Sequence, residues 1–383
     1  MKYVDGTWRF QLDRIAADRI RLDRDPQLVS ALPDKLRRAV VKLKPTGPIH
    51  LGGQLEFTGS AHRQRATTSR WDITLDTYGG SLDCGVKLDH LQGGVRLTGG
   101  FDGQTFRSQG ELKIDSASCK GFYFTDIRGP MLLNGTEVIL GHWGRRNGNQ
   151  GQARHLSAKF LGGSVVADVW AGLGTTPKFA LRAGLSDANL KTVSQEHIPG
   201  KTAMKGKIHA QLQLSGTGRG INSLAGRGEI ALREADVYEL PVMVALLKIL
   251  SVRQVDPTAF TQGDISFDIK ANHLYFDKLD FQGDAISLHG KGEMDLDQHI
   301  KLKFYTTIGP GQFQIPLVKN LLGQASQQIM VIRVDGSLSK PKLTQEVFPN
   351  LNRALNQIGD TPKRGRETLV PKLETIRRSL ERR

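Results

Sequence analysis

Apolar and polar residues alternate strictly in many short segments of the chain. In the segment DISFDIK, Ile265, Phe267 and Ile269 share one parity, and polar residues occupy the other. The segments WDITLD, GGVRLTG, ELKID, KIHAQLQLSG, ISLHG, EMDLD and IKLKFY repeat this pattern. A two-residue period predicts strands with one face against apolar material and the other in water. Short connections, such as the hairpin signal Asn134-Gly135, favour antiparallel meanders over parallel units, which need a helix between strands.

Few segments show helical periodicity. We predict helices over residues 33–43, 186–198, 239–250, 315–329 and 343–358, and a basic amphipathic helix in the tail from about Arg366. The segment 239–250 is apolar nearly all round, so we expect it to cap or line an apolar surface and to be covered on every side. The order strand, small-residue link, helix, strand occurs near the start and again from Lys178. This weak repeat indicates an elongated architecture built by stacking one unit.

Composition narrows the classes of partner. The formal net charge of +15 favours anionic partners, and residues 361–383 alone carry eight Lys or Arg against three Glu. Clusters of aromatic and basic residues are missing, so nucleic acid is not predicted as a partner. The longest apolar stretch is too short for a membrane span, and the first residues already look like a strand. We therefore expect the chain to be a fragment whose targeting segment or anchor lies upstream.

Each segment that resembles a catalytic or cofactor-binding motif lacks an element that the motif requires. The segment GTGRGINSLAGRG follows a strand, but it leads into another alternating strand rather than the helix that a dinucleotide site requires. The segment PGKT lacks the upstream glycine of a phosphate-binding loop. The ten His and the two cysteines, Cys84 and Cys119, show no metal-ligand spacing, and the sequence does not decide whether the cysteines pair. We expect no enzyme activity, no metal and no cofactor.

The one-sided apolar pattern leaves two possibilities. If the sheet closes on itself or on helices, the apolar residues form an ordinary core. If the curved sheet stays open, they line a long groove, and so much exposed apolar area implies a ligand or partner. Lipid acyl chains suit a continuous lining that lacks discrete polar selectors.

An ordered series of segments resembles the C-terminal region of AsmA-like proteins of bacterial envelopes, a group that includes TamB-like and YhdP-like members. The series covers residues from about 179 to 343. Its segments are LSDANLKTV, GKIHAQLQLSGTG, INSLAGRGEIALREADVYELPVMVALLKIL, FTQGDISFDIKANHLYFDKLDFQGDAISLHGKGEMDLDQHIKLKF and MVIRVDGSLSKPKL. Residues 1–178 fit more loosely, as further β-repeats.

The resemblance implies a long β-groove with a hydrophobic floor, on the periplasmic side of the inner membrane, and a role in phospholipid transport or outer-membrane assembly. We therefore predict a mainly β protein, with antiparallel meanders forming an elongated, twisted open groove and a few packed or capping helices. The predicted regions are a β-repeat region (1–178), a groove module (179–345) and a helical, basic tail (346–383). The predicted lipid-binding residues are Ile208, Leu212, Leu214, Ile265, Phe267, Ile269, Ile286, Leu288, Met294, Leu296, Leu302 and Phe304.

Alternatives remain for the function and for the tail. A structural or assembly scaffold would use the same sheet to bind proteins along an edge strand. A carbohydrate-active β-solenoid enzyme would need clustered carboxylates and turn ladders of fixed period, which the sequence lacks. The tail presents Arg377, Arg378, Arg382 and Arg383 beside an apolar stripe. It would lie on an anionic membrane surface, dock to a partner or remain solvated.

Overall fold

The structure is a computed structural model of the 383-residue chain. It describes residues 2–4, 6–32, 34–60, 66–83, 86–142, 154–172, 174–197, 204–218, 220–249, 260–283, 286–308 and 330–346. The predicted helix 315–329 and the four arginines of the tail lie outside the described residues.

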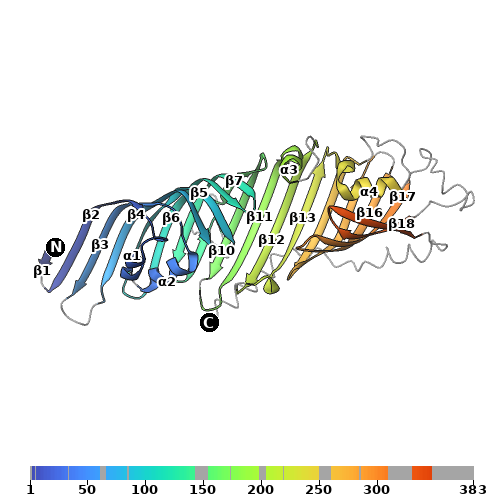
Figure 1. Ribbon diagram of the computed structural model, residues 1–383. Coiled ribbons are helices and arrows are strands. Elements are labelled where there is room, and N and C mark those ends of the chain that lie inside the picture. The colour runs from blue at the N-terminus through green and yellow to red at the C-terminus, as the bar shows by residue number, and fades with distance from the viewer. Residues whose placement is uncertain are drawn as a thin grey trace, which may run out of the picture.

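The described residues form one antiparallel sheet of 19 strands (Figure 1). Those of the first half are β1 (Lys2–Val4), β2 (Thr7–Ile20), β3 (Ile49–Ser60), β4 (Thr68–Asp83), β5 (Lys87–Phe101), β6 (Phe106–Cys119), β7 (Phe122–Asn134), β8 (Glu137–Leu140), β9 (Leu156–Phe160) and β10 (Gly163–Gly172). Those of the second half are β11 (Lys178–Asn189), β12 (Lys207–Thr217), β13 (Ala225–Arg233), β14 (Gln262–Lys270), β15 (His273–Gln282), β16 (Ile286–Asp295), β17 (His299–Ile308), β18 (Met330–Ser337) and β19 (Lys340–Glu346).

Neighbours in the sheet are neighbours in the sequence. Each strand pairs antiparallel with the next, except that β8 and β9 lie end to end between β7 and β10. The sheet does not close, because β1 pairs with β2 and β19 pairs with β18 at opposite ends of the molecule. The fold is therefore the predicted mainly β protein with an elongated, twisted, open meander. Pairing continues from β10 to β11 across residue 178, so the sheet is not interrupted where we placed the first boundary.

Four α-helices occur among the described residues: α1 (Pro26–Ala31), α2 (Asp34–Leu43), α3 (Leu190–His197) and α4 (Pro241–Ile249). Short 3-10 turns, η1 (Ile221–Ser223) and η2 (Val237–Glu239), precede β13 and α4. Helices α2, α3 and α4 agree with three predicted helices, whereas α1 was not predicted. Helix α1 begins after Asp25, whose carboxylate accepts a hydrogen bond of 2.9 Å from the Leu28 amide.

Two predicted helices were partly wrong. Residues 186–189 continue β11, because a bulge near Asp187 lets this strand stay paired with β12. Residues 343–346 belong to β19, where Leu343 pairs with Val334. In both places the hydrogen bonds of a neighbouring strand override a weak helical pattern.

A series of β-bulges runs along one side of the sheet. The register shifts between Ala17 and Ile20 in β2, between Asp89 and Gln92 in β5, and between Leu185 and Ala188 in β11. At each shift one residue adopts a left-handed conformation, and these residues are Arg19 (φ 57°), His90 (φ 53°) and Asp187 (φ 59°). Bulges bend a strand and increase its twist, so they account for the curved cross-section of a sheet this long.

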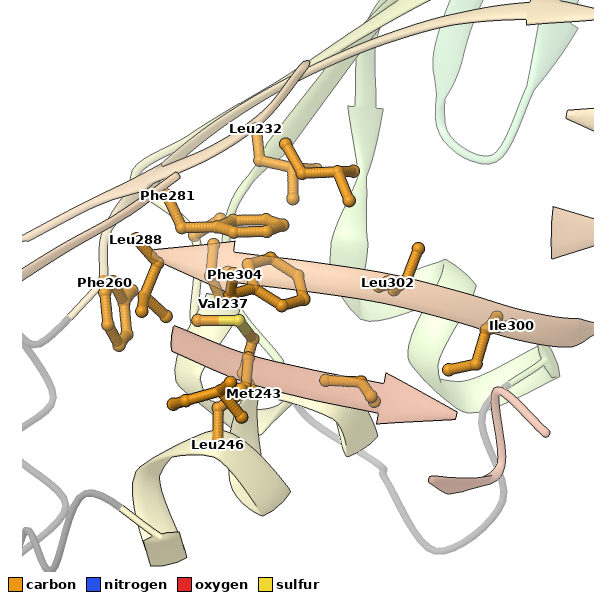
Figure 2. Packing of buried hydrophobic residues seen from close by; sticks show 14 of the residues in the cluster. Leu232, Val237, Met243, Leu246, Phe260, Phe281, Leu288, Ile300, Leu302 and Phe304 are labelled. Atoms are coloured by element: carbon orange, nitrogen blue, oxygen red, sulfur yellow. The ribbon is translucent and has the colours of Figure 1, made fainter. Parts of the chain in front are cut away.

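The apolar side chains with the least exposure gather at the C-terminal end. Helix α4 and the turn η2 lie across one face of the last strands and bring Val237, Met243 and Leu246 onto Leu288 and Phe304 (Figure 2). All five of these side chains are at most 1% exposed. At this end the sheet therefore has an ordinary closed core.

Helix α4 is not covered on every side. Met243 and Leu246 are buried, but Val244 is 47% exposed, which corrects the expectation of cover on every side. No helix among the described residues is both long enough and apolar enough to cross a membrane.

Candidate functional site

One face of the sheet is apolar along its whole length. The strand register connects one residue of every strand from β2 to β19, except β8, into a single row, which we call the central row. Its members are Ala17, Leu51, Leu75, Val95, Leu112, Gly129, Leu156, Ala167, Ala183, Leu212, Gly228, Phe267, Phe276, Gly292, Leu302, Val334 and Leu343. Paired residues of neighbouring strands point to the same side, so the row marks a continuous apolar face. Every member of the row is apolar or glycine.

The opposite face carries the charges and holds them in cross-strand ion pairs. Arg96 on β5 binds Asp72 on β4 at 2.7 Å, and Arg227 on β13 binds Asp268 on β14 at 2.9 Å. The hydrogen bonds from the Arg96 guanidinium lower the pKa of the Asp72 carboxyl. These pairs are solvent-exposed, so each contributes little to stability.

Glycines on the apolar face lie beneath large side chains of the next strand. A Cβ placed on Gly228 would lie 2.2 Å from the Phe267 ring, and one on Gly216 would lie 2.5 Å from the Phe179 ring. In the same way the indole of Trp8 occupies the space above Gly59. The aromatic rings therefore fill the space that a side chain on each glycine would take.

Exposure divides the apolar face into two parts. Beneath α4 the side chains of Leu288, Phe304 and Val334 are completely buried. On strands β2 to β11 most lining side chains, Leu55 and Ile73 among them, are only half-buried. We call β2 to β11 the open part and β13 to β19 the closed end; β12 lies between them.

The predicted lipid-binding residues fall mainly in or beside the closed end. Ile269, Leu288, Leu302 and Phe304 are buried in the structure, so protein already surrounds them. Ile208, Leu212, Leu214, Ile265, Phe267 and Met294 are half-buried on the apolar face. Ile286 lies in β16 on the same parity, but its side chain lies outside the described residues. Leu296 lies beyond the end of β16 in a turn and is 49% exposed.

The open part supplies lining residues that we did not assign from sequence. They are Leu51, Leu55, Ile73, Leu75, Val95, Leu112 and Ile127, together with Phe10 and Leu12 on β2. The alternation in WDITLD, GGVRLTG and ELKID already gave the parity of Ile73, Leu75, Val95 and Leu112. The missing information was which stretch of the face α4 leaves uncovered.

Two polar side chains on the open part, Trp71 and Ser108, bind each other. The Trp71 indole Nε1 donates to Ser108 Oγ at 3.2 Å across β5, and Ser108 Oγ donates to the Thr98 carbonyl at 3.1 Å. The Trp71 ring also stacks on Phe106, with centroids 4.9 Å apart. This polar pair therefore leaves no unmet hydrogen bond directed at a ligand.

The described residues contain no cluster of His, Cys, Asp and Glu that could hold a metal ion. Cys119 is a free, half-buried thiol, and Cys84 lies outside the described residues.

The glycine-rich segment connects β12 to β13 as an antiparallel pair, with Gly218 in the turn at φ 79°. No family model, curated protein or solved structure matches the chain.

Proposed function

We propose that the protein binds the acyl chains of lipids along the open part of its apolar face and transfers lipid without catalysis. The single observation that carries this proposal is the uncharged central row, whose members over β2 to β11 are half-buried except Gly129 and Ala167. Exposed apolar area of this extent has to be covered by a ligand or a partner in water. A lining without polar selectors suits acyl chains, whose headgroups would remain outside in solvent.

The dimensions of the open part fit lipids that lie along it. Strands β2 to β11 occupy nine positions in the sheet, which spans roughly 40 Å at the usual spacing of about 4.8 Å between strands. That length exceeds the hydrocarbon thickness of a bilayer, about 30 Å. The open part is therefore long enough for more than one acyl chain in file.

The proposed setting is the bacterial cell envelope, on the periplasmic side of the inner membrane, with phospholipid transport or outer-membrane assembly as the process. The support for this setting is the resemblance to AsmA-like proteins, whose implied groove agrees with the open sheet. The basic tail with Arg377 to Arg383 would contact an anionic membrane surface.

Photo-crosslinking tests directly whether lipid contacts the apolar face. A benzophenone side chain at Leu55 faces the apolar side, whereas the same group at the adjacent, exposed Gln54 faces the charged side. After expression in a diderm bacterium, we expect lipid adducts at position 55 and none at 54, read by mass spectrometry of the intact protein. Equal labelling at both positions, or none at either, would contradict a lipid groove.

A charge placed in the open part tests transfer. Ile73→Asp puts a carboxylate among lining residues, and Thr74→Asp puts one on the charged face of the same strand. Because burying an ionised carboxylate against hydrocarbon is strongly unfavourable, we expect Ile73→Asp to reduce transfer of fluorescent phospholipid between vesicles at least tenfold. Thr74→Asp is expected to stay within about twofold of the unmodified protein, with circular dichroism confirming that both variants fold.

A scaffold that binds proteins along a sheet edge is the second candidate. The observation that favours it is the partly unpaired outer edge of β2. It predicts a protein partner on that edge and a purified protein free of lipid.

A further inference from the structure

The two edges of the sheet differ in their protection. At the C-terminal edge, β19 carries Lys340, Pro341 and Lys342, and α4 packs against this strand. Lysine, proline and a covering helix are the usual means by which proteins prevent edge-to-edge pairing. The described part of the C-terminal edge therefore has features that prevent it from pairing with a strand of another molecule.

Among the described residues, the N-terminal edge has neither a covering helix nor proline. Strand β1 pairs with Thr7, Trp8 and Arg9 alone, so among the described residues nothing pairs with the outer side of β2 from Phe10 to Ala17. Phe10 and Leu12 are 39% and 38% exposed, although the matching positions on inner strands are half-buried. This stretch presents unpaired backbone groups beside exposed apolar side chains, which is a template for another strand.

The sequence of this stretch is complementary to itself in the antiparallel direction. When Asp13 is placed opposite Arg14 of a second copy, opposite charges meet on the charged face. The same register sets Leu12 opposite Ile15 and Phe10 opposite Ala17, all on the apolar face. We propose that two copies of the chain associate through this edge as a symmetric antiparallel dimer in this register.

The first bulge of β2 makes the register possible. In a regular strand Leu12 and Ile15 would point to opposite faces. Here the register shifts between Leu12 and Ile15, because Asp13 and Arg14 both lie opposite the single residue Gln54 of β3. The side chains of Leu12 and Ile15 therefore both lie on the apolar face. The two-fold axis passes through this bulge, so each copy contributes the same surface. The paired stretch ends at β1 on one side and at the second bulge, near Arg19, on the other.

The dimer also extends the apolar face. Leu12 and Phe10 of one copy meet Ile15 and Ala17 of the other, so the open parts of the two copies become continuous. The closed ends then lie at the two far ends of the assembly. This inference rests on the edge and its sequence and does not depend on lipid binding.

Charge exchange tests the register with the full chain. Asp13→Arg and Arg14→Asp each place like charges opposite one another at two symmetry-related positions, whereas the double variant Asp13→Arg/Arg14→Asp restores the pairs. We expect sedimentation equilibrium to show a dimer for the unmodified protein, at least tenfold weaker association for each single variant, and recovery in the double variant. A monomer at every soluble concentration, single variants that dimerise normally, or a double variant that fails to recover would overturn the proposal.

A cross-link provides a second measurement that does not depend on charge. In a background with both native cysteines changed to Ser, Leu12→Cys chains carrying one affinity tag are mixed with Ile15→Cys chains carrying another. Oxidation is expected to join the two tags in the mixture, while Leu12→Cys chains alone stay largely uncrosslinked. Equal cross-linking in both samples would refute the register, even if the protein is a dimer.

Discussion

Removing one buried side chain from α4 tests whether the closed end is a local core. Leu246 is completely buried in the cluster with Phe304 and Leu288, and Val244 on the same helix is 47% exposed. The perturbation is Leu246→Ala, and Val244→Ala is the matched control. Both changes shorten an apolar side chain on the same short helix, so they differ mainly in what surrounds that side chain.

The expected magnitudes follow from burial. Truncating a fully buried Leu to Ala costs about 2–5 kcal/mol, because transfer free energy is lost and a cavity is left. A mid-range loss of about 3 kcal/mol is roughly a hundredfold change in the opening equilibrium. For Val244→Ala we expect a change within about 0.5 kcal/mol, since the side chain is half in solvent and Ala favours helix.

Hydrogen exchange read by mass spectrometry is the suitable assay, because each strand contacts mainly its neighbours and stability in such arrays is local. Leu246→Ala should raise the exchange rates of the slowest amides in β16, β17 and β18 about a hundredfold and leave β3 to β5 unchanged. Unchanged rates in β16 to β18 would refute the packing of α4 on these strands. Equal loss of protection across the whole sheet would refute a local core.

Two further predictions concern single positions. Gly228→Ala should cost about 1–3 kcal/mol in urea unfolding, since its Cβ would meet the Phe267 ring at 2.2 Å, whereas Gly184→Ala, with nothing within 4 Å, should be neutral or stabilising. Equal effects would contradict the ring-over-glycine packing. Hydrogen bonds from the backbone and hydroxyl of Thr105 and from a neighbouring amide lower the pKa of Asp102 to about 2 in the β5–β6 turn. A depressed carboxyl pKa stabilises the fold above the unfolded value of 3.8, so the stability difference from Asp102→Asn should shrink as pH falls from about 4 towards 2. A stability difference between the unmodified protein and Asp102→Asn that does not change between pH 4 and pH 2 would contradict the lowered pKa of Asp102.

Strand parity could be predicted from sequence because it depends on local pattern alone. Ile265, Phe267 and Ile269 share a face in DISFDIK, and in the structure they point to the apolar side of β14. The hairpin at Asn134-Gly135 is confirmed, with Asn134 the last residue of β7 and Gly135 in the turn at φ 59°. These features need no information from distant residues.

Exposure of the same residues could not be predicted, because it depends on where α4 lies. The sequence of α4 shows that it is apolar, but its place on β16 to β19 comes from packing between distant segments. Leu288 and Leu55 therefore look alike in sequence, although one is buried and the other lines the open part. Alternation alone therefore identifies which residues lie on the apolar face, but not which strands of that face are left exposed.

The internal repeat connects the two halves of the sheet more closely than the sequence indicated. Strand β2, the helices α1 and α2, and β3 form one unit, and β11, α3 and β12 form another. Each unit has a bulge before its helix and an Ile-His pair at the start of its second strand. In the first unit His50 lies 3.0 Å from Asp18 of the bulge, and in the second His209 lies 4.0 Å from Asp187.

The repeated bulge brings the same residue types together in both units. It places an aspartate and a histidine side by side on the charged face, while the alternation within each strand sets its parity. Adding a unit would lengthen the apolar face without changing its chemistry, as in other stacked repeats. Closure is made separately, by η2 and α4, which cover the apolar face at one end of the sheet.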